Sequence, residues 1–116
     1  MINGAHVLVY SDDVEADRAF FRDVLEFACV DAGHGWLIFK LPPAEAAFHP
    51  SDGTPPRAEL YLMCDDLQAT IERLAARGAM CGAIDRAAWG TKTTIRLPGG
   101  GAIGLYQPSH PTALVL

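Results

Sequence analysis

His6-Val-Leu-Val-Tyr-Ser-Asp-Asp13 returns later in the chain as Glu59-Leu-Tyr-Leu-Met-Cys-Asp-Asp66, at an offset of 53 residues (59 minus 6). Internal repeats come first in reading a sequence, because a missed repeat leads to the wrong fold. Two copies in 116 residues are too few for a solenoid. The repeat predicts two similar halves that share one sheet, with a pocket where they face each other. Identical residues at the same offset include Ala5 and Ala58, Ala16 and Ala69, and Trp36 and Trp89.

Each copy predicts a strand followed by a helix. Residues 5–10 are rich in β-branched and aromatic side chains, which favour a strand. Asp12 with Glu15 three positions later has the spacing of a helix N-cap, and the second copy repeats it with Asp65 and Gln68. We therefore expect helices at about 13–25 and 66–77. Gly78 can end the second helix in a left-handed conformation, whereas Glu26-Phe27 is a weaker stop in the first. The expected core residues are Val14, Phe20, Phe21, Val24 and Leu25 from the first helix, and Leu67, Ile71, Leu74 and Ala75 from the second.

Three short strands are expected after each helix, at 28–32, 36–41 and 44–49 in the first half and at 80–84, 91–97 and 102–107 in the second. Gly99-Gly100-Gly101 provides a hairpin turn, since it lacks the helix and Lys-Ser/Thr of a phosphate loop. Each half thus reads βαβββ, in an α+β fold. The predicted organisation is one domain: a first module at 4–50, a linker at 51–57, a second module at 58–108 and a tail at 109–116.

Composition limits the classes of function. The net charge of −5 argues against non-specific nucleic-acid binding, and no apolar run reaches membrane-spanning length. The three cysteines are odd in number and widely spaced, which fits reduced thiols. Because no signal peptide is evident either, we expect a cytoplasmic protein without nucleic-acid or membrane partners.

Strand alternation places His6, Leu8 and Tyr10 on one face, and the repeat adds Glu59, Tyr61 and Met63 to it. If the sheet curves into a cup, His6 and Glu59 converge at its centre. An imidazole and a carboxylate there could hold a divalent cation such as Zn, Ni, Mn or Fe. The bland alternatives are a hydrogen-bonded structural His6 and a Glu59 solvated near Arg57.

The paired βαβββ modules, the His in the first strand, the "DD" helix entry and the final "IGLYQP" strand resemble the vicinal oxygen chelate superfamily. That family includes glyoxalase I, extradiol dioxygenases and bleomycin-resistance proteins. The resemblance implies a curved mixed sheet with the helices outside, a homodimer, and metal ligands from the first and last strand of each module. Those positions fall on His6, Glu45 and Glu59, with Gly104 in the fourth.

Gly104 departs from the metal-binding pattern, because glycine has no side-chain ligand. The register at the first module's end is also open, since an alternative alignment puts Ala46 in place of Glu45. We therefore rank a small-molecule-binding protein, which need not hold a metal, ahead of a divalent-metal-dependent lyase, isomerase or dioxygenase. A structural or interaction domain is third. The expected pocket comprises His6, Leu8, Tyr10, Glu59, Tyr61, Met63, Trp89 and Tyr106.

Overall fold

The computed structural model describes residues 6–45, 47–48, 50 and 53–114 of the chain. It confirms a mixed α+β fold. The first half contains α1 (Val14–Asp23), β1 (Cys29–Asp31) and β2 (Leu37–Phe39). The second half contains β3 (Tyr61–Met63), α2 (Leu67–Ala76), β4 (Asp85–Ala87), β5 (Gly90–Arg96) and β6 (Ala102–Pro108).

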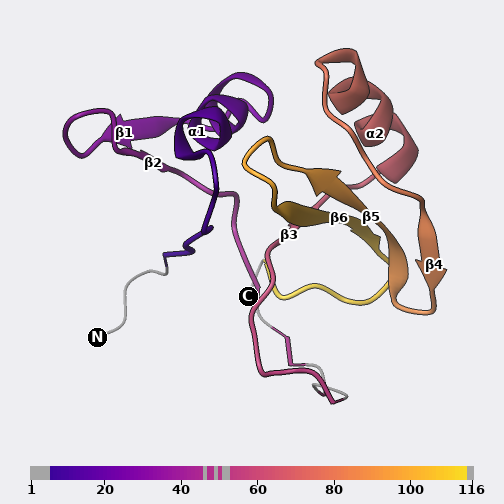
Figure 1. Ribbon diagram of the computed structural model, residues 1–116. Helices are drawn as coiled ribbons and strands as arrows, with labels where there is room; N and C mark the ends of the chain where they lie inside the picture. The colour runs from indigo at the N-terminus through magenta and orange to yellow at the C-terminus, as the bar shows by residue number, and fades with distance from the viewer. Residues whose placement is uncertain (1–5, 46, 49, 51–52, 115–116) are drawn as a thin grey trace.

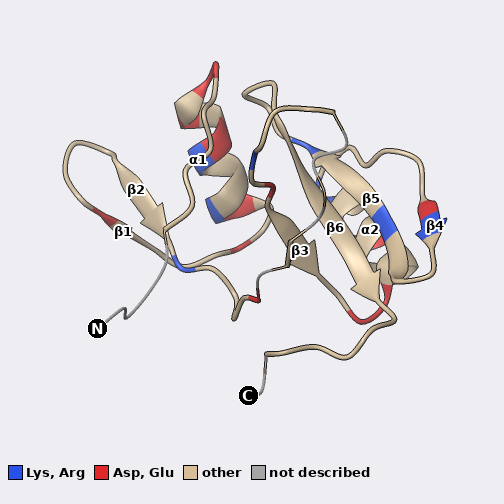
Figure 2. Cartoon of the chain, turned by 90° about the horizontal axis from the view of Figure 1, so that it is seen from below, with Lys and Arg blue, Asp and Glu red and all other residues tan. Residues whose placement is uncertain are grey.

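The second half forms the predicted βαβββ module. Its sheet has the order β3-β6-β5-β4, in which β3 runs parallel to β6 and the other neighbours are antiparallel. The hairpin of β5 and β6 turns at Gly99-Gly100-Gly101, where Leu97 N donates to Gly101 O (2.9 Å). Helix α2 lies against one face of this sheet and leaves the other face open (Figures 1 and 2).

The hydrophobic core lies between α2 and the sheet. Among the described residues, all the buried hydrophobic side chains belong to the second half: Leu67, Leu74, Ala79, Ile95, Leu97, Ile103 and Leu105. Ile95 and Leu97 are 0% and 1% exposed, and complete burial of such side chains stabilises the fold by roughly 1.5–3 kcal/mol each. Phe20, Phe21, Val24 and Leu25 of the first half pack against this core while remaining partly exposed.

Both helices begin one residue later than the sequence predicts. Asp13 Oδ1 accepts from Ala16 N (3.1 Å), and Asp66 Oδ1 accepts from Ala69 N (3.0 Å), so these residues are the N-caps in place of Asp12 and Asp65. The second Asp of each pair has the non-helical backbone that an N-cap requires, and its carboxylate then reaches the third amide of the helix. Two predicted core residues, Val14 and Ala75, are exposed.

The helix ends differ between the halves. Gly78 adopts the predicted left-handed conformation after α2, with φ +89°. Glu26 takes a left-handed conformation after α1 (φ 61°) although it is not glycine. Its carboxylate pairs with Arg77 at 2.9 Å, which joins the end of the first helix to the end of the second.

The first half departs from the predicted module. Residues 6–10 are exposed and form no strand. The described residues of 44–49 form no strand either. Ala5, Ala46 and His49 lie outside the described residues. The physical reason is visible in the second half, where the first and last strands of the module pair with each other. A strand that lacks its ladder partner is not formed. The remaining two strands, β1 and β2, make a separate antiparallel pair.

One prediction in the second half is shifted along the chain. Residues 80–84 were expected to be a strand, but β4 begins at Asp85 and only Cys81 makes an isolated bridge, to Ile95. The segment still follows β5, since Gly82 N donates to Thr94 O (2.9 Å). A Cβ at Gly82 would lie 2.8 Å from Thr94 Oγ1, so this close approach suits glycine.

A polar clasp joins the two halves. Asp17 of α1 is 9% exposed, and its Oδ1 accepts from Gly99 N (2.7 Å) in the turn between β5 and β6. Asp12 N donates to Gly99 O (2.9 Å), so the same turn residue is bonded on both sides. Within the described part of the chain, no helix has the length and apolar character needed to span a bilayer.

Candidate functional site

An aromatic cluster covers the face of the sheet that α2 leaves open. We define the aromatic face as Tyr61 of β3, Lys92 of β5, Tyr106 of β6, and Trp89 in the turn between β4 and β5. The ring centroid of Tyr106 lies 5.7 Å from that of Tyr61 and 5.8 Å from that of Trp89, both edge to face. Strand register explains the grouping, because Tyr106 pairs with Lys92 and lies two residues from Gly104, the partner of Tyr61.

Lys92 supplies the positive charge of the aromatic face. Its Nζ lies 5.9 Å from the ring centroid of Tyr61 and 5.5 Å from that of Trp89. Contacts of this length between an ammonium and an aromatic ring are attractive. The side chain therefore lies across two aromatic rings, with its ammonium at the open surface of the sheet.

Gly104 is covered by the ring of Tyr61. A Cβ built at this position would overlap three atoms of that ring, so even alanine requires Tyr61 to move. The position that the family resemblance assigns to a fourth metal ligand is thus occupied by an aromatic ring of the neighbouring strand.

The two predicted carboxylate ligands both have other partners. Hydrogen bonding from Tyr61, then from Arg57, lowers the pKa of Glu59, and Arg57 Nε lies 3.1 Å from Glu59 Oε1. Glu45 Oε2 accepts from Ala113 N at 2.6 Å. Glu45 also lies near Tyr106: burial first, then the charge and hydrogen bonding of Glu45, raises the pKa of the Tyr106 hydroxyl.

The structure brings together only some of the predicted pocket residues. Glu59, Tyr61, Trp89 and Tyr106 meet at the aromatic face. His6, Leu8 and Tyr10 are exposed on a segment without strand pairing, so the alternation expected for them is not realised. Met63 lines a groove between the two helices instead, with Leu25, Leu74 and Arg77 among its neighbours.

The metal donors do not converge in this arrangement. Nowhere in residues 6–45, 47–48, 50 and 53–114 do three His, Cys, Asp or Glu side chains gather closely enough to hold an ion. Together with the partners of Glu45 and Glu59 and the ring over Gly104, this donor geometry does not fit a metal. Metal binding through His6, Glu45 and Glu59 stays a prediction from the sequence.

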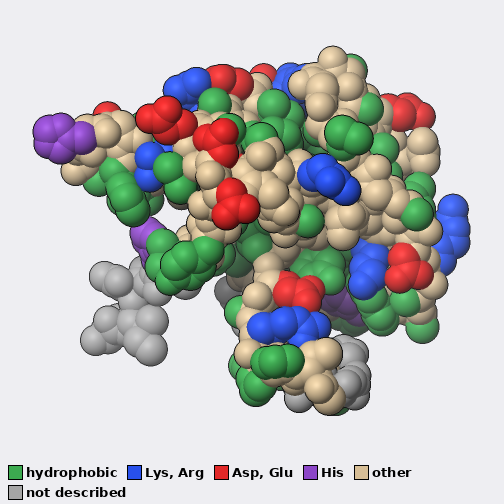
Figure 3. Space-filling view, in the orientation of Figure 1, with side chains coloured by type: hydrophobic (Ala, Val, Ile, Leu, Met, Phe, Trp, Pro, Cys, Tyr) green, Lys and Arg blue, Asp and Glu red, His purple; other side chains and the backbone are tan. Residues whose placement is uncertain are grey.

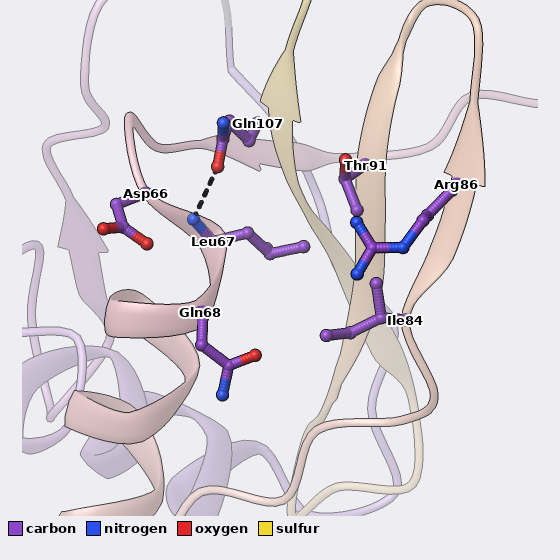
Figure 4. A pocket seen from close by; sticks show the side chains of 7 residues that line it. All are labelled: Asp66, Leu67, Gln68, Ile84, Arg86, Thr91 and Gln107. Atoms are coloured by element: carbon purple, nitrogen blue, oxygen red, sulfur yellow. Dashed lines mark hydrogen bonds between the residues drawn. The ribbon is translucent and has the colours of Figure 1, made fainter.

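A second, polar hollow lies at the start of α2 (Figure 4). Its lining residues are Asp66, Leu67, Gln68, Ile84, Arg86, Thr91 and Gln107. Gln107 Oε1 accepts from Leu67 N at 2.8 Å, so this amide satisfies one of the free N–H groups of the helix start. Gln107 therefore has a structural role here.

Two residues of the aromatic face region were missed by sequence reasoning. In β5, Thr93 and Ile95 face the core, so Lys92 faces the open side of the sheet. The alternation of residues along the strand predicts this placement. His110 lies beside the ring of Tyr106, with centroids 6.0 Å apart. No local pattern could have placed His110, since it follows the last strand.

Sequence comparison gives the family. Residues 4–105 match the Glyoxalase/Bleomycin resistance protein/Dioxygenase superfamily. The chain belongs to this superfamily. A search of curated proteins found no match.

Solved structures of the superfamily share the fold. TnmS3, an antibiotic binding protein from Streptomyces sp. CB03234, is 26% identical, with a TM-score of 0.64 and coverage of 94% of this chain and 100% of that one. A glyoxalase/bleomycin resistance protein from the same organism is 27% identical over 85% and 95% of the two chains, with a TM-score of 0.58. A lactoylglutathione lyase from Agrobacterium tumefaciens is 21% identical over 90% and 92%, with a TM-score of 0.64, and shows likeness of fold alone.

Proposed function

We propose that this superfamily member binds a small, flat aromatic molecule at the aromatic face. The observation that carries the proposal is the cluster of Tyr61, Trp89 and Tyr106 on a rigid sheet, with Lys92 across two of the rings. Aromatic rings with a few placed polar groups are the usual lining of small-molecule sites. The likeness to a protein described as antibiotic binding supports the same class of function.

The two tryptophans provide a matched test. In a Trp36→Phe variant, Trp89 is the sole tryptophan, because the chain contains two. Titration with acridine should change its emission saturably, since a ring stacked on the face contacts Trp89 directly. The Trp89→Phe variant keeps only Trp36, which lies under Arg18 in the first half, and should show no saturable change. Equal responses in both variants, or none in Trp36→Phe, would rule the proposal out.

A metal-dependent lyase, isomerase or dioxygenase is the alternative that the family resemblance raised. Glu45 and Glu59 already have hydrogen-bond partners, and the ring of Tyr61 covers Gly104. Both observations favour binding without a metal. The discriminating measurement is the metal content of protein purified without chelator. Stoichiometric Zn, Ni, Mn or Fe that is lost in His6→Ala would overturn binding without a metal.

We also propose that the protein is a homodimer in which a second copy covers the exposed apolar residues of the first half. Leu8, Trp36 and Phe48 are 63%, 58% and 98% exposed, and hydrophobic side chains are visible on the surface in Figure 3. Large exposed apolar surfaces mark association sites. Strand β3 is also an edge of its sheet, so its outer side is open to another strand. Light scattering should give twice the chain mass of 12.5 kDa.

A further inference from the structure

The segment that follows β6 turns back on the side of the sheet that faces away from α2. Figure 1 shows it, in yellow, running beneath the strands on the side away from α2. Ser109 N donates to Trp89 O and Ser109 Oγ donates to Ala88 O, both at 2.9 Å, which joins the start of the segment to the turn that carries Trp89. We call residues 109–114 the strap.

The strap makes two further contacts, one with the aromatic face and one with Glu45 beside it. The ring of His110 lies 6.0 Å from that of Tyr106 at an interplanar angle of 31°, and His110 Nε2 is 3.4 Å from the Tyr106 hydroxyl. Three residues later, Ala113 N donates to Glu45 Oε2 at 2.6 Å. The imidazole of His110 thus contacts Tyr106, and the backbone N–H of Ala113 is bonded to the neighbouring carboxylate of Glu45.

The charges around the aromatic face favour such a donor. Of the two carboxylates beside the aromatic face, Glu59 is already paired with Arg57 at 3.1 Å, whereas Glu45 accepts the backbone N–H of Ala113. Hydrogen bonding from Tyr61 and Arg57, and to a smaller extent the charge of Lys92, lowers the pKa of Glu59. Burial and then the negative charge of Glu45 raise the pKa of Tyr106, which shows that Glu45 lies beside that ring. A donor or cation that reaches Glu45 is therefore stabilised, whereas an added carboxylate is not.

We propose that the strap is an internal competitor for the aromatic face, and that the ligand which displaces it is a planar aromatic amine. This inference rests on the proposed binding of a flat aromatic molecule. The ligand ring replaces His110 against Tyr106, and a ligand N–H replaces that of Ala113 at Glu45. A site that is partly occupied by its own chain binds its ligand more weakly, by the fraction of molecules in which the site is free.

Substitutions in the strap test the competition, with proflavine as the aromatic amine and acridine as the comparator that lacks an N–H donor. Ala113→Pro removes the N–H that Glu45 accepts, and Ala113→Gly keeps it as the matched control. His110→Ala removes the ring, and Thr112→Ala is a control on the exposed side of the strap. Fluorescence anisotropy gives the affinity of each full-length variant, and circular dichroism checks that it is folded.

Loss of one hydrogen bond or one ring contact of ordinary strength should tighten proflavine binding about fivefold in Ala113→Pro and in His110→Ala. The two controls should bind as the unsubstituted protein does. In Glu45→Ala, proflavine should lose its advantage over acridine. Unchanged affinity in both Ala113→Pro and His110→Ala would overturn the role of the strap as a competitor while leaving the proposed function intact. Equal binding of proflavine and acridine in every variant would overturn the ligand class. Absence of binding in all variants would overturn the proposed function and this inference together.

Discussion

At the scale of single residues, Gly104 offers no ligand to a metal but leaves room for the aromatic ring of Tyr61. The family resemblance made it notable for what it lacks, which is a carboxylate ligand. The structure adds that its place is taken by the ring of Tyr61. That ring is part of the aromatic face, so the absence of a side chain at Gly104 is what lets Tyr61 lie against β6.

Gly104→Ala should therefore cost stability and weaken aromatic binding. The added methyl group overlaps the Tyr61 ring, and forced repacking of this kind costs about 1–3 kcal/mol of unfolding free energy. Urea denaturation measures the loss. In a Tyr61→Ala background the same substitution should cost much less, since the ring is gone. Equal costs in the two backgrounds would show that the overlap is not the cause.

The cysteines give a prediction about reactivity with pH. Burial raises the pKa of the Cys64 and Cys81 thiols, which reduces their reactive thiolate fraction at neutral pH. Cys29 is exposed. At mildly alkaline pH, a chromogenic disulfide reagent should modify Cys29 first, and the other two should speed up only as pH rises further. Cys29→Ser should abolish the fast phase, and a fast phase that survives it would contradict the assignment.

At the scale of elements, the clasp between α1 and the turn of β5 and β6 is one of the contacts that join the two halves. Gly99 is buried between Asp12 and Asp17 and bonded to both. The other oxygen of the Asp17 carboxylate is buried without a hydrogen-bond partner. The negative charge is tolerated because Asp17 lies in the first turn of α1, where the helix dipole favours it.

Asp17→Ala should destabilise the protein by about 1–3 kcal/mol, because it leaves the buried Gly99 N–H without an acceptor. Asp17→Asn keeps an acceptor oxygen and should cost less. Asp12→Ala is the neutral control, since Asp12 takes part in the clasp through its backbone. Chemical denaturation compares the three variants, and equal stability of Asp17→Ala and Asp17→Asn would contradict the role given to the acceptor.

The second half could be predicted from sequence because its elements are stabilised by contacts within that half. The alternating pattern of β5 and the helix-capping residues near Asp66 predicted the bounds of α2, β5 and β6 to within a few residues. The strand predicted at residues 5–10 was wrong, because residues 6–10 form no strand in the structure. Its pattern is as good as that of β3, but a strand exists only with a ladder partner, and pattern carries no information about that partner. The contact of His110 with Tyr106 could not be predicted either, because the local sequence does not show which strand a following segment will contact.

At the scale of the whole molecule, a stable dimer makes unfolding depend on concentration. If a second copy covers the apolar residues of the first half, the melting temperature should rise as the protein concentration is raised. Leu8→Asp puts a charge on the exposed stretch and should remove this dependence, whereas Glu15→Gln on the exposed side of α1 should preserve it. A melting temperature independent of concentration in the unsubstituted protein would argue for a monomer.

The uneven core has a consequence for biosynthesis. Since the buried hydrophobic residues among those described lie between Leu67 and Leu105, the first half is synthesised before any of them has been translated. The nascent chain then displays Val7 to Tyr10 without the surface against which α1 later packs. Such unfinished chains are prone to aggregate. We expect the yield of soluble protein to depend more strongly on chaperones during translation than on the stability of the finished fold.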